Sequence, residues 1–339
     1  VGSEMCIRDS SRRWRRRAIT LPAVYLGLVL VTGLLPLLLL GTLILDIVRA
    51  VQGRGRFAVT RLLLFGWWYL VAEVLGLTSM LLFWLVTGFG RRRQAYVSLS
   101  YALQSRWAAA LFGGFTFLMR IQVEVEGLDA AAPGPMILMM RHASMVDTPL
   151  PIVLVMRGRG IRMRYVMKRE LLWDPALDVA GNVIPNYFID RRSDDRAAEV
   201  AHIAALAEDL GDEEAVVIYP EGTRYTAEKR EQVLASLARK DPAAAERAAQ
   251  FRNVLPPRPG GPVALLGAGT DVVMCAHVGL DESAEVRHLL DGSLAGTRVQ
   301  VVFWRIPAGE IPEGEGARME WLIEQWRRVD RWVGDRHGE

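Results

Sequence analysis

Two long apolar stretches open the chain. Residues 19–47 carry no charge before Asp46, and residues 62–89 carry only Glu73. Each stretch exceeds the roughly 20 residues that a helix needs to cross the hydrocarbon core of a bilayer. The pattern predicts a two-helix membrane hairpin over residues 18–93. Two alternatives stay open: a buried helical hairpin in a soluble fold, and a kinked hairpin that enters one leaflet without crossing.

From residue 94 the pattern changes to short apolar stretches that alternate with helical ones. A helical run to Met119 precedes seven β-rich stretches, and helical segments are predicted at residues 196–210, 227–251 and 317–333. This alternation predicts an α/β domain over residues 94–339, with a mostly parallel or mixed sheet of about seven strands flanked by helices on both faces. The β-rich stretches are IQVEVEG, PMILMM, MRYVMK, NVIPNYFID, AVVIYP, VVMCAHVG and RVQVVFWRI.

Charge adds a location to this picture. The formal net charge is only +3, but arginines cluster within residues 12–17 and 91–93. These clusters outnumber the arginines of residues 49–61 between the two stretches, so a crossing hairpin would place the α/β domain on the cytoplasmic side. The two cysteines form neither a disulfide framework nor a metal-ligand cluster, which fits a reducing compartment. The basic clusters suit anionic lipid headgroups or nucleic acid, and the partner expected for this chain is membrane lipid, with no nucleic acid.

The first residues, VGSEMCIRDS, look like translated sequencing-adaptor sequence. We expect residues 1–10 to carry no fold information, and residues 1–17 to be an artefactual start followed by a basic segment. A cleaved signal peptide is not expected, because the first apolar stretch is too long, lacks a small-residue cleavage site and is followed by a second one.

A polar group, RHASMVD, follows the buried strand predicted at MILMM. A neutral imidazole such as that of His142 can take a proton from an alcohol if a carboxylate holds its other nitrogen. Asp147 can fold back across the short loop to supply that carboxylate. The alternative is that Ser144 and Asp147 merely cap a helix beginning near Val146. This pattern alone leaves both interpretations open.

A second polar group, YPEGTR, follows the strand predicted at AVVIYP. Glycine lets a ligand approach the backbone closely, while threonine and arginine donate hydrogen bonds to phosphate oxygens. Arg191 and Arg192 follow YFID and add two guanidinium groups, unless neighbouring aspartates pair with them. A phosphate site beside a proton-abstracting histidine predicts a phosphorylated alcohol as substrate. The predicted binding residues in YPEGTR are Glu221, Gly222, Thr223 and Arg224.

These motifs occur in one order: HxxxxD at His142 and Asp147, then YFIDR, then YPEGTR. In that order they resemble the motifs of the glycerophospholipid acyltransferase family, specifically the 1-acylglycerol-3-phosphate acyltransferases, over about residues 122–280. The resemblance implies that His142 is the general base and Asp147 its partner. Arg141 stands where the family often has asparagine, and His277, in AHVGL, is interpreted as a packed strand residue. The resemblance also implies an acceptor-phosphate site at Arg191, Glu221, Gly222 and Arg224, and Lys168 matches a lysine that the family often carries.

The predicted activity is transfer of a fatty acyl group from a thioester, acyl-CoA or acyl carrier protein, to the free hydroxyl of a lysophospholipid. The expected acceptor is 1-acylglycerol-3-phosphate, giving phosphatidic acid, and lysocardiolipin is the alternative. No metal, cofactor or covalent intermediate is expected, because thioesters are activated donors; Ser144 as a nucleophile lacks the nucleophile-elbow pattern. Two other classes stay open: a metal-dependent hydrolase using His142, Asp147 and Glu221, and a non-catalytic membrane scaffold.

Overall fold

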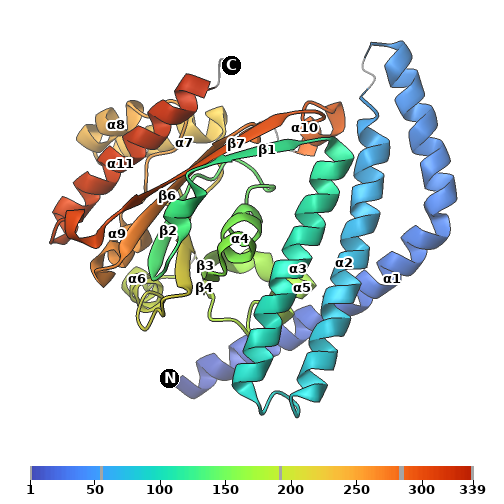
Figure 1. The fold of residues 1–339 in the computed structure, drawn as a ribbon, viewed down its shortest axis with the longest axis horizontal. Helices are drawn as coiled ribbons and strands as arrows, with labels where there is room; N and C mark the ends of the chain where they lie inside the picture. Colours follow the sequence, from blue (N-terminus) through green and yellow to red (C-terminus); the bar gives the residue numbers. More distant parts are fainter. Residues whose placement is uncertain (1, 54–55, 191–192, 282–285, 337–339) are drawn as a thin grey trace. The chain divides into compact units, whose positions relative to one another are not determined.

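The computed structural model describes residues 2–53, 56–190, 193–281 and 286–336 (Figure 1). The chain divides into two compact units. The first consists of Val1–Leu118 and Met167–Phe188, and the second of Met119–Val166 and Ile189–Glu339. The chain therefore leaves the second unit once, after Val166, and returns to it at Ile189.

Three long helices dominate the first unit: α1 (Gly2–Val51), α2 (Ala58–Val86) and α3 (Arg93–Met119). The two long apolar stretches of the sequence form α1 and α2, as predicted. Asp46, the only acidic residue of the first stretch, is buried and accepts a hydrogen bond from Thr60 N at 2.8 Å. Its carboxylate thus satisfies a backbone donor in the first turn of α2, where a helix has unpaired N–H groups.

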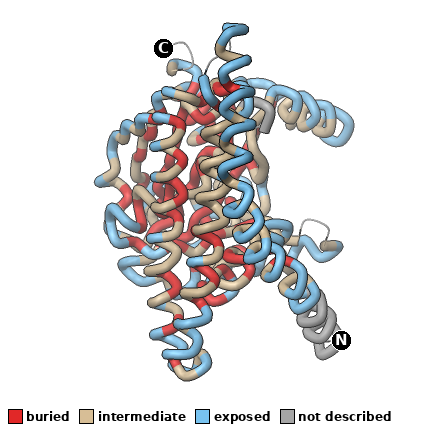
Figure 2. Tube along the Cα trace, turned by 90° about the vertical axis from the view of Figure 1, so that its right-hand side faces the viewer, coloured by how far each residue is buried: buried red, intermediate tan, exposed pale blue. Residues whose placement is uncertain are grey.

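Both apolar helices are long and apolar enough to cross a membrane, over Arg13–Val51 and Ala58–Val86. Large apolar side chains of α1 are exposed along its length; Val29 and Leu37 are each 68% exposed. Figure 2 also shows the low burial of α1, which is drawn mainly in tan and pale blue beyond its grey start. A long apolar helix with so little burial is typical of a helix that contacts lipid or another apolar partner.

A short helix, α5 (Pro175–Ala180), is held to the long helices of the first unit. Glu73 of α2 accepts a hydrogen bond from Ala176 N at 3.2 Å. Asp178 is fully buried and pairs with Arg16 at 2.7 Å and with Arg17 at 3.0 Å. Two residues of the predicted basic segment therefore compensate a buried carboxylate, so removing them would leave a buried charge unpaired.

A mixed seven-stranded sheet has the order β1-β7-β6-β2-β5-β3-β4, and the predicted α/β fold is confirmed. Strands β6, β2, β5 and β3 run parallel to one another, whereas β7 runs antiparallel to β6 and carries β1 parallel to itself. The predicted stretch NVIPNYFID yields only a three-residue strand, because residues 181–185 form turns. The strands are β1 (Gln122–Glu126), β2 (Met136–Met140), β3 (Arg162–Lys168), β4 (Tyr187–Ile189), β5 (Glu214–Ile218), β6 (Asp271–Val278) and β7 (Arg298–Ile306).

Helices cover the sheet within the second unit, and Figure 1 shows α9 and α11 on one face and α4 on the other. The amphipathic α11 buries Leu322, Trp326 and Val329. The helix predicted over residues 227–251 is two helices, because Asp241 caps a new one and Pro242 occupies its first turn. The helices of this unit include η2 (Pro151–Met156), α4 (Arg157–Arg159), α6 (Arg196–Ala205), α7 (Ala227–Lys240), α8 (Pro242–Ala249), α9 (Gly260–Leu265), α10 (Val286–Asp291) and α11 (Glu315–Arg336).

The register of the central strands brings three chain segments to one edge of the sheet. Strand β2 is buried at every position and lies between β5 and β6. Met139 is paired with Ile218 of β5 and with Met274 of β6. Because the three strands are parallel, the residues that follow them meet at their carboxyl ends, where α/β sheets commonly bind ligands.

Candidate active site

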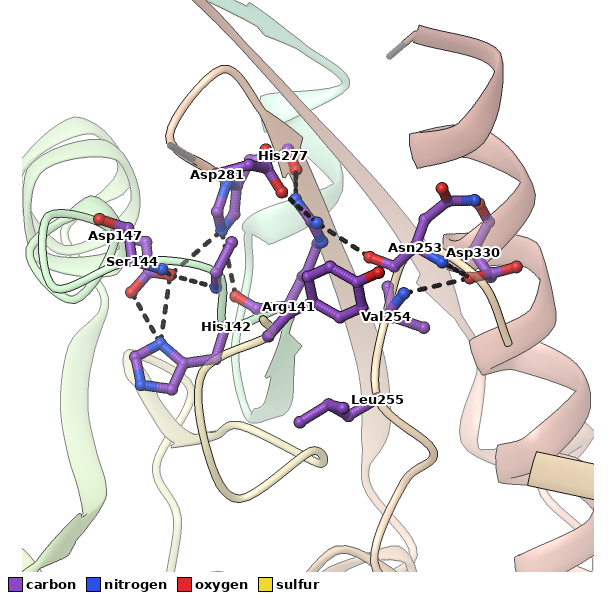
Figure 3. Close-up of polar contacts among 12 residues, drawn as sticks. Arg141, His142, Ser144, Asp147, Asn253, Val254, Leu255, His277, Asp281 and Asp330 are labelled. Atoms are coloured by element: carbon purple, nitrogen blue, oxygen red, sulfur yellow. Dashed lines mark hydrogen bonds and ion pairs between the residues drawn. The ribbon is translucent and has the colours of Figure 1, made fainter. Parts of the chain in front are cut away.

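His142 lies just beyond the carboxyl end of β2 and is held there by a fold-back of the loop. Asp147 places its carboxylate oxygens 3.0 and 3.1 Å from His142 Nδ1. The same carboxylate accepts hydrogen bonds from Ala143 N at 2.7 Å and Ser144 N at 2.8 Å (Figure 3). Asp147 therefore satisfies backbone N–H groups of the loop that precedes it. The prediction of a helix beginning near Val146 is wrong, because the next helical residue after β2 is Leu150.

The electrostatics of this pair favour an ionised aspartate. Burial alone would raise the pKa of Asp147, but interactions with His142 and with His277 outweigh burial and hold this pKa well below its usual range. Asp147 is completely buried, whereas the His142 side chain is 13% exposed. His142 Nε2 makes no hydrogen bond within the described part of the chain.

Glu221 holds the backbone of His142 in place. Its Oε1 accepts a hydrogen bond from His142 N at 3.0 Å, and its Oε2 accepts one from Leu255 N, also at 3.0 Å. Tyr225 N donates to His142 O at 2.8 Å, so the segment after β5 grips both polar groups of the His142 backbone. Burial raises the pKa of Glu221 to about 8, against the lowering effects of Arg141 and of the two N–H donors.

Arg141 is fully buried and joins three segments behind His142. Its Nη1 donates to His277 O at 2.7 Å, and its Nη2 donates to Asn253 O at 2.9 Å and pairs with the carboxylate of Asp281 (Figure 3). Asp330 of α11 fixes the same loop, since its Oδ1 accepts from Asn253 N at 2.6 Å. A buried arginine with these partners rigidifies the support of the active-site loop.

Gly222 allows Arg258 to lie over the YPEGTR loop. Its φ of +64° favours glycine, and a Cβ at this position would lie 2.9 Å from both Cδ and Nε of Arg258. Arg258 N donates to Pro220 O at 2.9 Å, which fixes the backbone of the arginine beside the loop. Among the described residues, the Arg258 guanidinium makes no ion pair or hydrogen bond, so it adds an uncompensated positive charge here.

The structure brings together some of the predicted site residues. His142 is hydrogen-bonded to both Asp147 and Glu221, and Gly222, Thr223 and Arg224 continue the loop from Glu221. Arg191 lies outside the described residues. Lys168 ends β3 and belongs to the first unit, whereas His142 belongs to the second.

The sequence interpretation missed three features of the site. These are the hydrogen bonds by which Arg141 links distant segments, the approach of His277 to Asp147, and the position of Arg258 beside Gly222. Each adjoins a motif or a strand end, which is the signal that sequence offers. Ser144 is buried, and its Oγ accepts a hydrogen bond from Val146 N at 3.0 Å, so the structure gives this hydroxyl a role in the loop.

Within the described residues, no group of three or more His, Cys, Asp or Glu side chains is arranged so that it could hold a metal ion. The chemistry that this arrangement offers is proton transfer at His142 Nε2, supported by an ionised Asp147 at Nδ1.

Comparison with known proteins agrees with the motifs. Residues 122–265 match the model of the Acyltransferase family. A comparison with curated proteins gives no match. Among solved structures, the chain is similar to the 1-acyl-sn-glycerophosphate (LPA) acyltransferase PlsC from Thermotoga maritima, with 14% identity and a TM-score of 0.48 over 79% of this chain and 99% of that one. The matched residues 122–265 contain the HxxxxD and YPEGTR motifs, so this part of the chain carries an Acyltransferase domain.

Proposed function

We propose that this protein transfers a fatty acyl group from a thioester donor to the free hydroxyl of a lysophospholipid. The proposed acceptor is 1-acylglycerol-3-phosphate, and the product is phosphatidic acid. The observation that carries the proposal is the geometry of His142: Nδ1 is held 3.0 Å from an ionised carboxylate, while Nε2 is unpartnered among the described residues. This arrangement suits a general base for an alcohol.

The reaction needs one proton acceptor and no covalent intermediate. His142 Nε2 takes the hydroxyl proton of the acceptor as its oxygen attacks the thioester carbonyl. The tetrahedral intermediate then collapses, the carbon–sulfur bond breaks, and the imidazolium returns the proton to the leaving thiolate. Asp147 keeps the proton of neutral His142 on Nδ1 and stabilises the imidazolium that forms. Coenzyme A and acyl carrier protein are both donors of suitable chemistry.

The acceptor phosphate is assigned to the basic side of the YPEGTR loop. Arg224 and Thr223 offer donors for phosphate oxygens, and Arg258 adds a guanidinium next to Gly222. Arg191 and Lys168 remain proposed members of this site from the sequence. Glu221 has a different proposed role, because both of its oxygens accept backbone N–H groups, from His142 and Leu255.

Membrane attachment through α1 and α2 fits substrates that are lipids. The proposed location is a membrane surface, with the hairpin inserted and the catalytic domain on the cytoplasmic side. The exposed apolar residues of α1 support the insertion. An inserted anchor gives the site acceptors from the leaflet, so it raises the local substrate concentration without contributing catalytic groups.

One assay tests the proposal. Purified protein is incubated with lysophosphatidic acid or lysocardiolipin and with acyl-CoA or acyl carrier protein thioesters, and products are read by mass spectrometry. We expect acylated lysophosphatidic acid and full activity in EDTA. Turnover of lysocardiolipin alone would change the acceptor, loss of activity in EDTA would support the hydrolase class, and no turnover with any thioester would support a scaffold.

A further inference from the structure

A second histidine faces the catalytic aspartate. His277 lies on β6 and is fully buried. Its Nε2 is 3.1 Å from Arg141 O and 3.5 Å from Asp147 Oδ2. His142 and His277 thus approach the same carboxylate, one from its own loop and one from the neighbouring strand.

The contacts of His277 determine its tautomer. Both atoms that face Nε2, a carbonyl oxygen and an ionised carboxylate oxygen, accept hydrogen bonds, so Nε2 must carry a proton. Nδ1 is buried and has no hydrogen-bond partner among the described residues, which disfavours a second proton there. His277 is therefore a neutral donor, whose N–H is shared between a close carbonyl and a more distant carboxylate.

Arg141 locks this donor in place. The two residues are bonded reciprocally, because Arg141 Nη1 donates to His277 O at 2.7 Å and His277 Nε2 donates to Arg141 O. Arg141 N also donates to Cys275 O at 3.0 Å, which extends the pairing of β2 with β6. Because Arg141 O accepts from the His277 ring and Arg141 Nη1 donates to the His277 backbone, the ring has little freedom to turn away from Asp147.

We infer that His277 is a positioning residue for the His142–Asp147 pair, as a neutral N–H donor that fixes the carboxylate and moderates its hold on the proton of His142. The inference rests on the proposed function of His142. An N–H directed at a carboxylate stabilises its negative charge and weakens its attraction for a nearby imidazolium. Removing the donor should therefore make protonated His142 easier to form, so activity is lost at a higher pH on the acidic side.

The other titratable groups around Asp147 do not change charge on the acidic limb of the pH–rate profile. Tyr219, which follows β5, and Cys275 of β6 both interact with the carboxylate of Asp147; burial raises the pKa of both, so they stay neutral. Burial raises the pKa of Glu221 to about 8, on the alkaline side. A shift of the acidic limb would therefore report a change in the protonation of His142.

Two substitutions separate positioning from packing. His277→Gln keeps an N–H donor near the place of Nε2, whereas His277→Leu keeps bulk and removes the donor. We expect His277→Leu to lower kcat on the order of 10-fold with little change in KM, as partners that orient catalytic histidines do, and to move the acidic limb of the pH–rate profile to higher pH. His277→Gln should restore most of both properties.

Equal loss of melting temperature in both variants, with an unmoved acidic limb, would show that His277 only packs. A second readout does not depend on turnover: ¹⁵N-histidine NMR of the full-length protein between pH 5.5 and 8.5. The expected His277 signal is a neutral, Nε2-protonated imidazole that does not titrate. A titrating or Nδ1-protonated His277 overturns the inference, whereas failure of the proposed function appears separately as no acyl transfer by the wild type.

Discussion

Glu221→Gln should destabilise the protein most at low pH. This result would distinguish a buried side chain that holds the backbone of the site from one that binds the acceptor phosphate. In the wild type, the two oxygens accept from His142 N and Leu255 N, each at 3.0 Å. Glutamine keeps one oxygen but turns an NH₂ toward the other N–H. One buried hydrogen bond is lost and one donor is left unsatisfied, which costs about 1–3 kcal/mol.

The pH dependence follows from the raised pKa of Glu221, about 8 in the folded protein against 4.5 for a free glutamate. Between these values the folded state binds a proton that the unfolded state has released. This contribution to stability is complete below pH 4.5 and is lost as pH rises toward 8, with a slope of up to about 1.4 kcal/mol per pH unit. Glutamine does not titrate, so the variant loses this slope.

Thermal unfolding of the detergent-solubilised protein at pH 5.5, 7 and 8.5 measures the difference. At pH 5.5 the variant should melt lower, by about 2–4 °C for each kcal/mol. The gap should narrow or invert at pH 8.5. Glu231→Gln, on the exposed surface of α7, is the matched control and should change little. A gap that widens with pH would mean that Glu221 is ionised throughout, and the reasoning would fail.

Asp147→Asn should lower kcat by about 10³- to 10⁴-fold in a folded protein, because the amide no longer holds the required tautomer of His142; retained kcat would remove Asp147 from the mechanism. Arg224→Ala and Arg258→Ala should each raise the acceptor KM about 10- to 100-fold and leave the donor KM nearly unchanged, with exposed Arg252→Ala as the control; an unmoved acceptor KM would refute the phosphate site. Full-length protein should stay in membranes after washing with high salt and with carbonate, and extraction by salt alone would contradict insertion of α1 and α2.

Local patterns were enough to predict the elements and part of the site. A nearly uncharged stretch long enough to cross a bilayer can be recognised from consecutive residues, and so can a buried strand such as MILMM. The spacing of His142 and Asp147 within one loop is equally local. These features depend on neighbours in the chain, so the sequence shows them directly.

The rest depended on contacts between distant segments. His277 reaches Asp147 only because β2 pairs with β6, a neighbour that the order of strands along the chain does not reveal. The burial of Arg141 likewise depends on Asp281 and on the loop at Asn253. Glu221 was interpreted as a phosphate-site residue because it lies in YPEGTR, yet its side chain bonds to the backbone of His142 and Leu255.

The most direct test of the account compares acyl transfer by the wild type and by His142→Ala, with lysophosphatidic acid and a fatty acyl thioester. The rate of phosphatidic acid formation is measured by mass spectrometry, and circular dichroism checks the fold. We expect the wild type to form phosphatidic acid and the variant to be slower by about 10²- to 10⁴-fold. A folded His142→Ala protein that turns over at close to the wild-type rate would contradict the account.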